Sequence, residues 1–215
     1  MIKVVVLDVD GTLMDTNYLH TEAWAWAFEE VGRRPPRAEI HKQIGKGSGQ
    51  LVREFVDDED AAARVDELHG EIYLDLQEHV YPLPGAKELI ASLAERGYEV
   101  WLVTSAVPEE LEQYLDQLET DGKLAGITKS SDVEESKPAP DVFELALKKA
   151  GASPEETVAV GDAIWDVEAA AKAGIQTVAV LSGGAFSEQE LEEAGAVAVY
   201  NNCAGLLDAG FPENF

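Results

Sequence analysis

The sequence predicts an α/β fold: a doubly wound parallel sheet with a Rossmann-like core and an inserted α-helical cap domain. Two observations lead to this prediction. Short aliphatic runs alternate with helical patterns over most of the chain, which is typical of a parallel sheet covered by helices on both faces. From residue 16 to residue 80, however, apolar side chains recur only at helical spacing. We therefore expect residues 1–15 and 81–215 to form the α/β core and residues 16–80 to form the cap.

The expected strands of the core are short apolar runs. Residues 2–7 form a continuous aliphatic run, as in a central parallel strand that is buried on both faces. Further strands are expected at residues 100–103, 157–160, 177–181 and 196–200, and helices at residues 86–96, 108–118, 140–150, 166–173 and 187–193. Strand and helix thus alternate through the second part of the chain.

The expected insert contains two helical patterns. The first carries Trp24, Ala27, Phe28 and Val31, and the second carries Val65, Leu68, Ile72 and Leu76. We interpret the aromatic side chains as packing within the insert and not as a ligand cage. Residues 81–85, with two prolines and a glycine, are expected to end the second pattern and return the chain to the core.

Length, composition and charge exclude several classes of protein. A chain of 215 residues that is 46% hydrophobic can bury one sizeable core with a smaller inserted domain. Its formal net charge of -26 argues against nucleic acid and anionic membranes as partners. No run reaches the roughly 18 apolar residues of a membrane span and no signal-peptide layout is found, so we expect a cytoplasmic protein.

The sequence leaves the reason for the acidity and the oligomeric state open. The acidity fits either a high-salt cytoplasm or simple solubility. A monomer and a homodimer are both compatible with the sequence. Cys203 is the single cysteine, so it cannot form an internal disulfide, and we expect it to be structural or to lie at the surface.

The most informative segment follows the first expected strand and contains Asp8 and Asp10, with Gly11 directly after them. Ligands of open parallel sheets bind at the carboxyl ends of the strands, so both carboxylates are expected there. Residues i and i+2 of an extended segment point the same way, and Gly11 lets the backbone turn away. An aspartate can accept a phosphoryl group, and a second carboxyl group can move the proton.

Three later segments add the groups that phosphate chemistry needs. Thr104 and Ser105 end an expected strand with hydroxyl groups that can bind a phosphate oxygen. Lys137 supplies a cation just before a helix. Asp162 ends another strand and Asp166 follows four residues later, and such carboxylates suit a hard cation such as Mg²⁺.

In order, strand context and spacing, these segments resemble the haloacid dehalogenase superfamily, and in particular its phosphoglycolate phosphatase and beta-phosphoglucomutase-like subfamily with a helical cap. The resemblance covers essentially the whole chain. It implies a magnesium-dependent phosphatase that acts on a small phosphorylated metabolite, phosphoglycolate-like or a sugar phosphate, through an aspartyl-phosphate.

The resemblance also implies roles for single residues. Asp8 corresponds to the nucleophile and a metal ligand, and Asp10 to the general acid and base that offers its backbone carbonyl to the metal. Thr104 and Lys137 correspond to phosphate-binding residues, with Ser105 as a further candidate. Asp162 and Asp166 correspond to the remaining metal ligands, which act on Mg²⁺ directly or through its waters.

The residues also bear on other activities of the same superfamily. Asp10 disfavours a dehalogenase, which does not need it, and Lys42 and Lys46 lack the context of a Schiff-base lysine in phosphonate cleavage. A hexose-phosphate mutase shares every core motif and stays the main alternative. A non-catalytic phosphate-binding or regulatory protein is disfavoured because no motif is lost.

The cap offers one candidate substrate contact. Residues 44–50 interleave three glycines with polar groups and resemble the substrate-facing segment of phosphoglycolate-phosphatase-like proteins. Lys46 or Arg53 could bind a carboxylate or second charge of the substrate. A flexible turn between two cap helices explains the same residues, and the two interpretations stay open.

Overall fold

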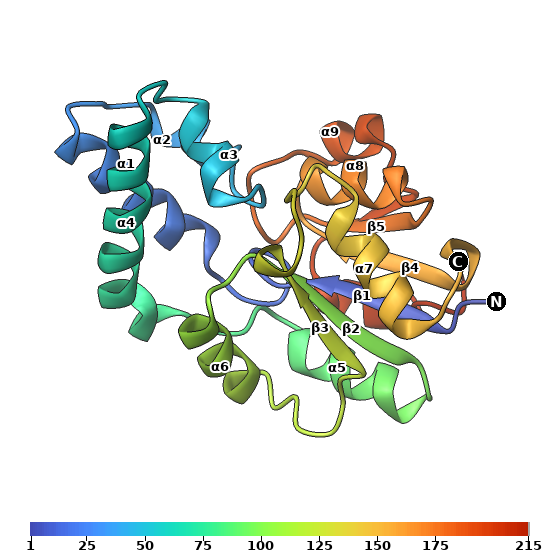
Figure 1. Ribbon diagram of the computed structural model, residues 1–215. Helices are drawn as coiled ribbons and strands as arrows, with labels where there is room; N and C mark the ends of the chain where they lie inside the picture. Colours follow the sequence, from blue (N-terminus) through green and yellow to red (C-terminus); the bar gives the residue numbers. More distant parts are fainter. Residues whose placement is uncertain (215) are drawn as a thin grey trace.

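The computed structural model describes residues 1–214 and contains a six-stranded parallel sheet with helices packed around it (Figure 1). The strands are β1 (Val4–Asp8), β2 (Glu99–Thr104), β3 (Gly126–Lys129), β4 (Thr157–Gly161), β5 (Gln176–Val180) and β6 (Ala198–Tyr200). Their order across the sheet is β3-β2-β1-β4-β5-β6, and every neighbouring pair is parallel. The predicted fold class is confirmed.

The sheet is covered by helices on both faces. These are α5 (Ala86–Glu95), α6 (Pro108–Gln117), α7 (Asp141–Ala150), α8 (Ile164–Lys172), α9 (Glu188–Ala194) and α10 (Cys203–Asp208), with short 3-10 turns η2 (Ser130–Asp132) and η3 (Pro154–Glu156). Because side chains alternate along a strand, Val5 and Leu7 pack with α5, α6 and α10, whereas Val4 and Val6 pack with α7 and α8.

Strand β1 lies in the middle of the sheet, and all five of its residues are buried. Its register pairs Asp8 with Val103 of β2 and Leu7 with Val160 of β4. The carboxyl ends of these three strands are therefore level with one another. Side chains just beyond them, although far apart in the sequence, are brought to one edge of the sheet.

The helical insert has its own apolar cluster. After β1 come α1 (Asn17–Glu30), α2 (Arg37–His41), α3 (Ser48–Arg53), α4 (Glu59–Leu76) and the 3-10 turn η1 (Gln77–His79), and none of the described strands falls among them. Figure 1 shows α1 beside α4, at a distance from the sheet. Trp24, Phe28, Ile40 and Leu51 are buried with one another there, as packing within the insert requires.

Two elements of the core were missed from the sequence. Strand β3 lies at the edge of the sheet, and only Thr128 among its four residues is buried, so it lacks the apolar run of a central strand. Helix α10 was missed as well, although Asn202 caps it by accepting from the backbone N–H of Gly205. The ends of the predicted strands and helices differ from the observed ones by one or two residues.

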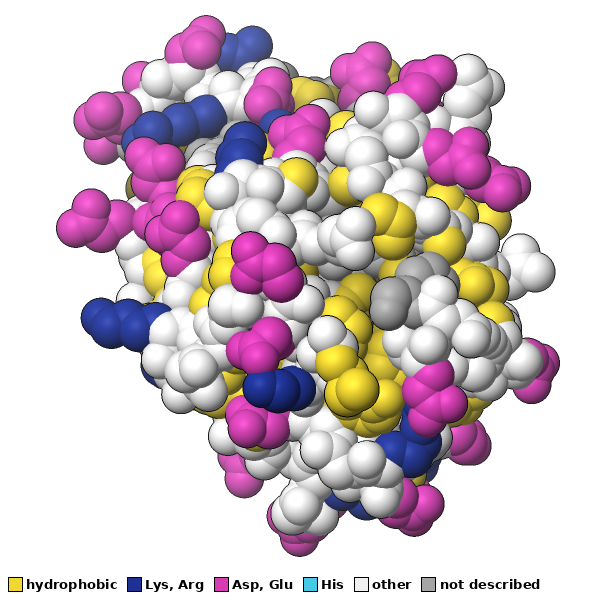
Figure 2. Space-filling view, turned by 90° about the vertical axis from the view of Figure 1, so that its right-hand side faces the viewer, with side chains coloured by type: hydrophobic (Ala, Val, Ile, Leu, Met, Phe, Trp, Pro, Cys, Tyr) yellow, Lys and Arg dark blue, Asp and Glu magenta, His cyan; other side chains and the backbone are white. Residues whose placement is uncertain are grey.

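The surface carries mostly acidic charge, and Figure 2 shows aspartates and glutamates spread over the face turned to the reader. Among the described residues no helix is both long and apolar enough to cross a membrane. Cys203, in α10, is a free cysteine and is fully buried.

Candidate active site

Three buried carboxylates meet at the carboxyl edge of the sheet. Asp8 ends β1, Asp162 follows β4, and Asp166 lies in the first turn of α8. Each offers an oxygen atom that lies within 4.8 Å of the others, and each residue is at most 4% exposed. The sequence placed these residues in separate motifs, and the fold brings them into one cluster.

Lys137 closes this cluster with the cation that the sequence led us to expect. Its Nζ donates to Asp8 Oδ1 at 2.6 Å and to Asp166 Oδ1 at 2.7 Å, and the side chain is 2% exposed. Lys137 precedes α7, so its ammonium reaches the cluster from a third segment of the core. A buried ammonium held between two carboxylates is fixed in place, which suits the binding of a phosphoryl oxygen.

Burial and crowding change the proton affinity of these groups. Burial, followed by repulsion from Asp166, raises the pKa of Asp8 to about 7, against the attraction of Lys137. Burial and the charges of Asp8 and Asp166 raise the pKa of Asp162 well above its usual value. Although burial alone would lower it, the two carboxylates raise the pKa of Lys137, which therefore stays charged.

Asp10 has different surroundings. Thr16 Oγ1 donates to Asp10 Oδ1 at 2.8 Å, and His20 Nε2 lies 3.5 Å from the same oxygen. Burial raises the pKa of Asp10, but the hydrogen bond and charge of His20 and the hydrogen bond from Thr16 outweigh burial, so the pKa lies below the usual value. Asp8 and Asp10 are thus only two residues apart, and their pKa values are shifted in opposite directions.

The histidines behind Asp10 were not predicted from the sequence. His20 Nδ1 lies 3.1 Å from His69 Nε2, and the ring of His20 stacks on Tyr73 at 3.8 Å. His69 in turn stacks on Trp24 at 3.7 Å. His20, Trp24, His69 and Tyr73 come from α1 and α4, whose periodicity indicated packing alone.

Small polar residues hold the loop that carries Asp8 and Asp10. Thr12 Oγ1 lies 3.2 Å from both Asp8 Oδ2 and Asp162 Oδ1, and Asn17 Nδ2 donates to Asp162 Oδ2 at 2.9 Å. Gly11 has a φ of 75°, and a Cβ there would lie 2.6 Å from Asp162 Oδ2. The loop therefore needs glycine both for its turn and for the close approach of the carboxylate.

The predicted hydroxyl groups lie at the end of β2. Thr104 is 1% exposed, and its Oγ1 accepts from the backbone N–H of Ala106 at 3.0 Å. This bond leaves the hydroxyl hydrogen of Thr104 to be donated. Ser105 is exposed and lines a cavity beside Asp10.

That cavity, called the vestibule below, has a volume of about 900 Å³ and lies between the insert and the core. Lys46 and Arg53 line it, as the cap-loop prediction requires. Lys46 Nζ is paired with Glu54 Oε1 at 2.8 Å and lies 4.1 Å from the ring centre of Trp165. Arg53, in the last turn of α3, is exposed.

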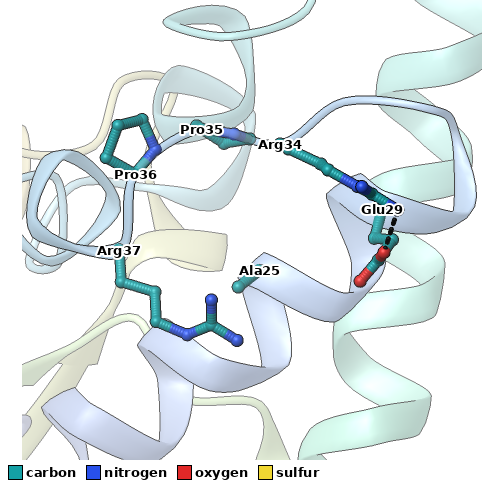
Figure 3. A pocket seen from close by; sticks show the side chains of 6 residues that line it. All are labelled: Ala25, Glu29, Arg34, Pro35, Pro36 and Arg37. Carbon is teal, nitrogen blue, oxygen red and sulfur yellow. Dashed lines mark hydrogen bonds and ion pairs between the residues drawn. The ribbon is translucent and has the colours of Figure 1, made fainter.

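A second cavity lies within the insert and is lined by Ala25, Glu29, Arg34, Pro35, Pro36 and Arg37 (Figure 3). Its volume is about 410 Å³, and Arg34 is paired there with Glu29. None of the predicted site residues lines it, so the vestibule is the cavity that belongs to the site.

The carboxylate cluster fits a divalent metal ion. Asp8, Asp162 and Asp166 supply oxygen atoms, which Mg²⁺ prefers as ligands. Burial and the mutual repulsion of the carboxylates raise the pKa values of Asp8 and Asp162, although Lys137 acts in the opposite direction. A cation among them would relieve this repulsion.

A family model of haloacid dehalogenase-like hydrolases matches residues 2–174. The chain belongs to this family. The family and the general enzyme class, a hydrolase, are thereby confirmed. The individual roles of the site residues stay predictions.

Relatives span nearly the whole chain. A phosphoglycolate phosphatase of Pseudomonas fluorescens is 28% identical over 93% of this chain and 76% of its own length. The structure of a hydrolase from Pseudomonas syringae has 34% identity and a TM-score of 0.90, and covers 96% of this chain and 97% of that one. A beta-phosphoglucomutase from Clostridium difficile, at 20% identity and a TM-score of 0.84, covers 99% and 96% of the two chains and shares the fold.

Proposed function

We propose that the protein is a magnesium-dependent phosphatase that hydrolyses a small phosphorylated metabolite, phosphoglycolate-like or a sugar phosphate, through an aspartyl-phosphate on Asp8. The observation that carries the proposal is the buried cluster of Asp8, Asp162 and Asp166 with Lys137. The family and the phosphatase among the relatives support the same activity. The expected place of action is the cytoplasm.

In the first step, Asp8 attacks the phosphorus atom and the bond to the leaving alkoxide breaks. Lys137 holds phosphoryl oxygens beside the nucleophile, and Thr104 donates its hydroxyl hydrogen to another. Asp8, the Asp10 carbonyl, Asp162 and Asp166 would hold Mg²⁺, which would further neutralise the phosphoryl charge when bound. These residues position the phosphoryl group and neutralise its charge, which is most of what phosphoryl transfer requires.

Asp10 moves the proton in both steps. An arriving phosphoryl group is anionic and raises the proton affinity of the nearby Asp10, so the carboxyl group can protonate the leaving alkoxide. Asp10 is then ionised, which its lowered pKa favours, and it takes a proton from the water that hydrolyses the aspartyl-phosphate. Thr16 and His20 hold its carboxylate in place throughout.

Residues 16–80 would act as the cap over this reaction. Gln50 Nε2 donates to Ser136 O at 3.3 Å, and Trp165 Nε1 donates to Lys42 O at 2.9 Å, so two hydrogen bonds join the insert to the core. Such contacts exclude bulk water from the reacting groups.

The test is phosphate release from p-nitrophenyl phosphate, phosphoglycolate, sugar phosphates and nucleotides, with Mg²⁺ and with EDTA. Asp8→Asn is expected to abolish release while the circular dichroism spectrum is unchanged. Asp15→Asn is the matched control, because Asp15 is an exposed aspartate of the same loop, and it is expected to keep full activity. If Asp8→Asn still releases phosphate, Asp8 is not the nucleophile. If the wild-type protein releases no phosphate from any substrate, hexose-phosphate isomerisation is tested next.

A further inference from the structure

The carboxylate of Asp162 is held by a residue of the insert. Asn17, the first residue of α1, donates from its Nδ2 atom to Asp162 Oδ2 at 2.9 Å and to the carbonyl of Gly183 at 3.3 Å. Asn17 is 2% exposed and Asp162 is 4% exposed, so bulk water has little access to this bond. Both N–H groups of the amide are therefore used inside the protein, and one of them is directed at a carboxylate of the candidate metal site.

Two glycines close over this contact. A Cβ at Gly183 would lie 1.7 Å from Asp162 Oδ2, and a Cβ at Gly11 would lie 2.3 Å from Asn17 Nδ2. Any other residue at either position would displace the pair. Two backbone segments thus pack against one side-chain hydrogen bond, which leaves the carboxylate of Asp162 little freedom to rotate.

The orientation of the Asn17 amide follows from the same contacts. Turned over, the amide would direct its oxygen atom at Asp162 Oδ2 and Gly183 O, which are both acceptors. In the observed orientation Asn17 Oδ1 is buried and, among the described residues, has no hydrogen-bond partner. An unpaired buried acceptor is a cost to stability, so the benefit of asparagine at this position lies in its two N–H groups.

A second residue of the insert reaches the same carbonyl. His41, at the end of α2, has its Nε2 atom 2.9 Å from Gly183 O. A carbonyl oxygen only accepts, so this nitrogen carries the hydrogen atom. The ring of Tyr18, which follows Asn17, packs on His41 with 4.6 Å between the ring centres. The carbonyl of Gly183 thus joins α1 and α2 of the insert to the loop after β5, beside Asp162.

We propose that Asn17 is a positioning residue for the divalent cation: it holds the Asp162 carboxylate in the orientation that binds the cation, and it makes this orientation depend on the docking of the insert at Gly183. The inference rests on the proposed function, which assigns a divalent cation to Asp8, Asp162 and Asp166. Hydrogen bonds to metal-binding carboxylates orient these ligands, and their loss commonly reduces metal affinity by about 10- to 100-fold. Because coupled binding equilibria are reciprocal, the cation favours the docked insert as much as the docked insert favours the cation.

Isothermal titration calorimetry of the full chain with Mg²⁺ alone measures the affinity without turnover. We expect Asn17→Ala to raise the Kd for Mg²⁺ at least roughly tenfold, because it removes the donor to Asp162. Asn17→Ser is a milder change with a shorter donor, and it is expected to raise Kd as well, which keeps the test valid if Asn17→Ala does not fold. Asn201→Ala is the matched control, since Asn201 is an exposed asparagine after β6, and should bind Mg²⁺ like the wild type.

The coupling to the insert has its own pair of variants. His41→Phe keeps a ring beside Tyr18 and removes the donor to Gly183 O, so it is expected to raise the Kd for Mg²⁺ several-fold although the lost bond is not to a carboxylate. His41→Gln keeps an N–H donor and should bind Mg²⁺ like the wild type. In phosphate release from p-nitrophenyl phosphate, the Mg²⁺ concentration for half of the maximal rate should rank the variants in the same order. At saturating Mg²⁺ kcat should recover to within a few-fold of the wild-type value.

The outcomes separate the two proposals. If the wild-type protein does not bind Mg²⁺, the magnesium of the proposed function is wrong, and the role of Asn17 with it. If the wild type binds Mg²⁺ and both Asn17 variants bind it equally well, Asn17 is not a positioning residue, while the proposed function stands. If the Asn17 variants bind Mg²⁺ less tightly but His41→Phe binds it like the wild type, the affinity does not depend on docking at Gly183 and the coupling is wrong.

Discussion

Replacement of Lys137 by Met tests the electrostatic design of the site most directly. Lys137 is 2% exposed and holds Asp8 and Asp166 at 2.6 and 2.7 Å, with Asp162 in the same cluster. Met has nearly the same length but carries no charge. The variant therefore leaves three buried carboxylates close together without their cation.

The expected cost follows from this burial. Removal of one partner from a buried ion pair destabilises a protein by about 3–5 kcal/mol, because the other charge stays buried and unpaired. For a chain of this size each kcal/mol lowers Tm by about 2–4 °C, so we expect a decrease of about 6–20 °C in EDTA. Mg²⁺ should restore part of the loss, since a cation bound by the carboxylates takes over some of the neutralisation.

Urea denaturation and thermal unfolding of both proteins, each with EDTA and with Mg²⁺, measure this effect. Lys149→Met is the matched control: Lys149 is 40% exposed and 3.6 Å from Asp132, so its loss should cost less than about 1 kcal/mol. A Lys137→Met variant as stable in EDTA as Lys149→Met would refute the reasoning, because the carboxylates would then not depend on their buried cation.

Three further predictions concern stability. Tyr73 and Tyr114 share a buried hydrogen bond of 2.6 Å between their hydroxyl groups, so Tyr73→Phe should cost about 1–3 kcal/mol in urea denaturation, and Tyr73→Phe with Tyr114→Phe should be more stable than the single variant. Burial and the charge of His20 lower the pKa of His69 well below its usual value, so only the unfolded chain takes up its proton. Stability should fall by up to about 1.4 kcal/mol between neutral pH and pH 5.5, and His69→Gln should remove this part of the pH dependence. With 42 acidic and 16 basic residues, Tm should rise from low to molar KCl, and a Tm that does not rise would exclude the high-salt explanation.

The sequence was sufficient for most of the fold because central parallel strands have a strong signal. Strand β1 is aliphatic from Val4 to Leu7, and burial on both faces requires this. Strand β3 carried no such signal, since Gly126–Lys129 lies at the edge and only Thr128 among its residues is fully buried. In a four-residue edge strand, pairing with the neighbouring β2 contributes more to strand formation than the intrinsic β propensity of the residues does.

For the site, the sequence was sufficient where a residue follows a central strand. Asp8, Thr104 and Asp162 could be placed together because parallel strands end at one edge of the sheet. His20 and His69 could not, because they lie on α1 and α4 and meet only when the two helices pack. Helical spacing shows which face is apolar and does not show which residues of another helix will be opposite it.

The charges of the cluster explain why its residues alone do not complete the site. Asp8, Asp162 and Asp166 contribute three negative charges when ionised, Lys137 contributes one positive charge, and -3 + 1 leaves -2. Burial and this excess of negative charge together raise the pKa values of Asp8 and Asp162. One divalent cation would reduce it to zero, whereas a monovalent cation would leave a net negative charge facing an anionic phosphoryl group. The charge count therefore favours a divalent cation over a monovalent one, in agreement with the Mg²⁺ of the proposed function.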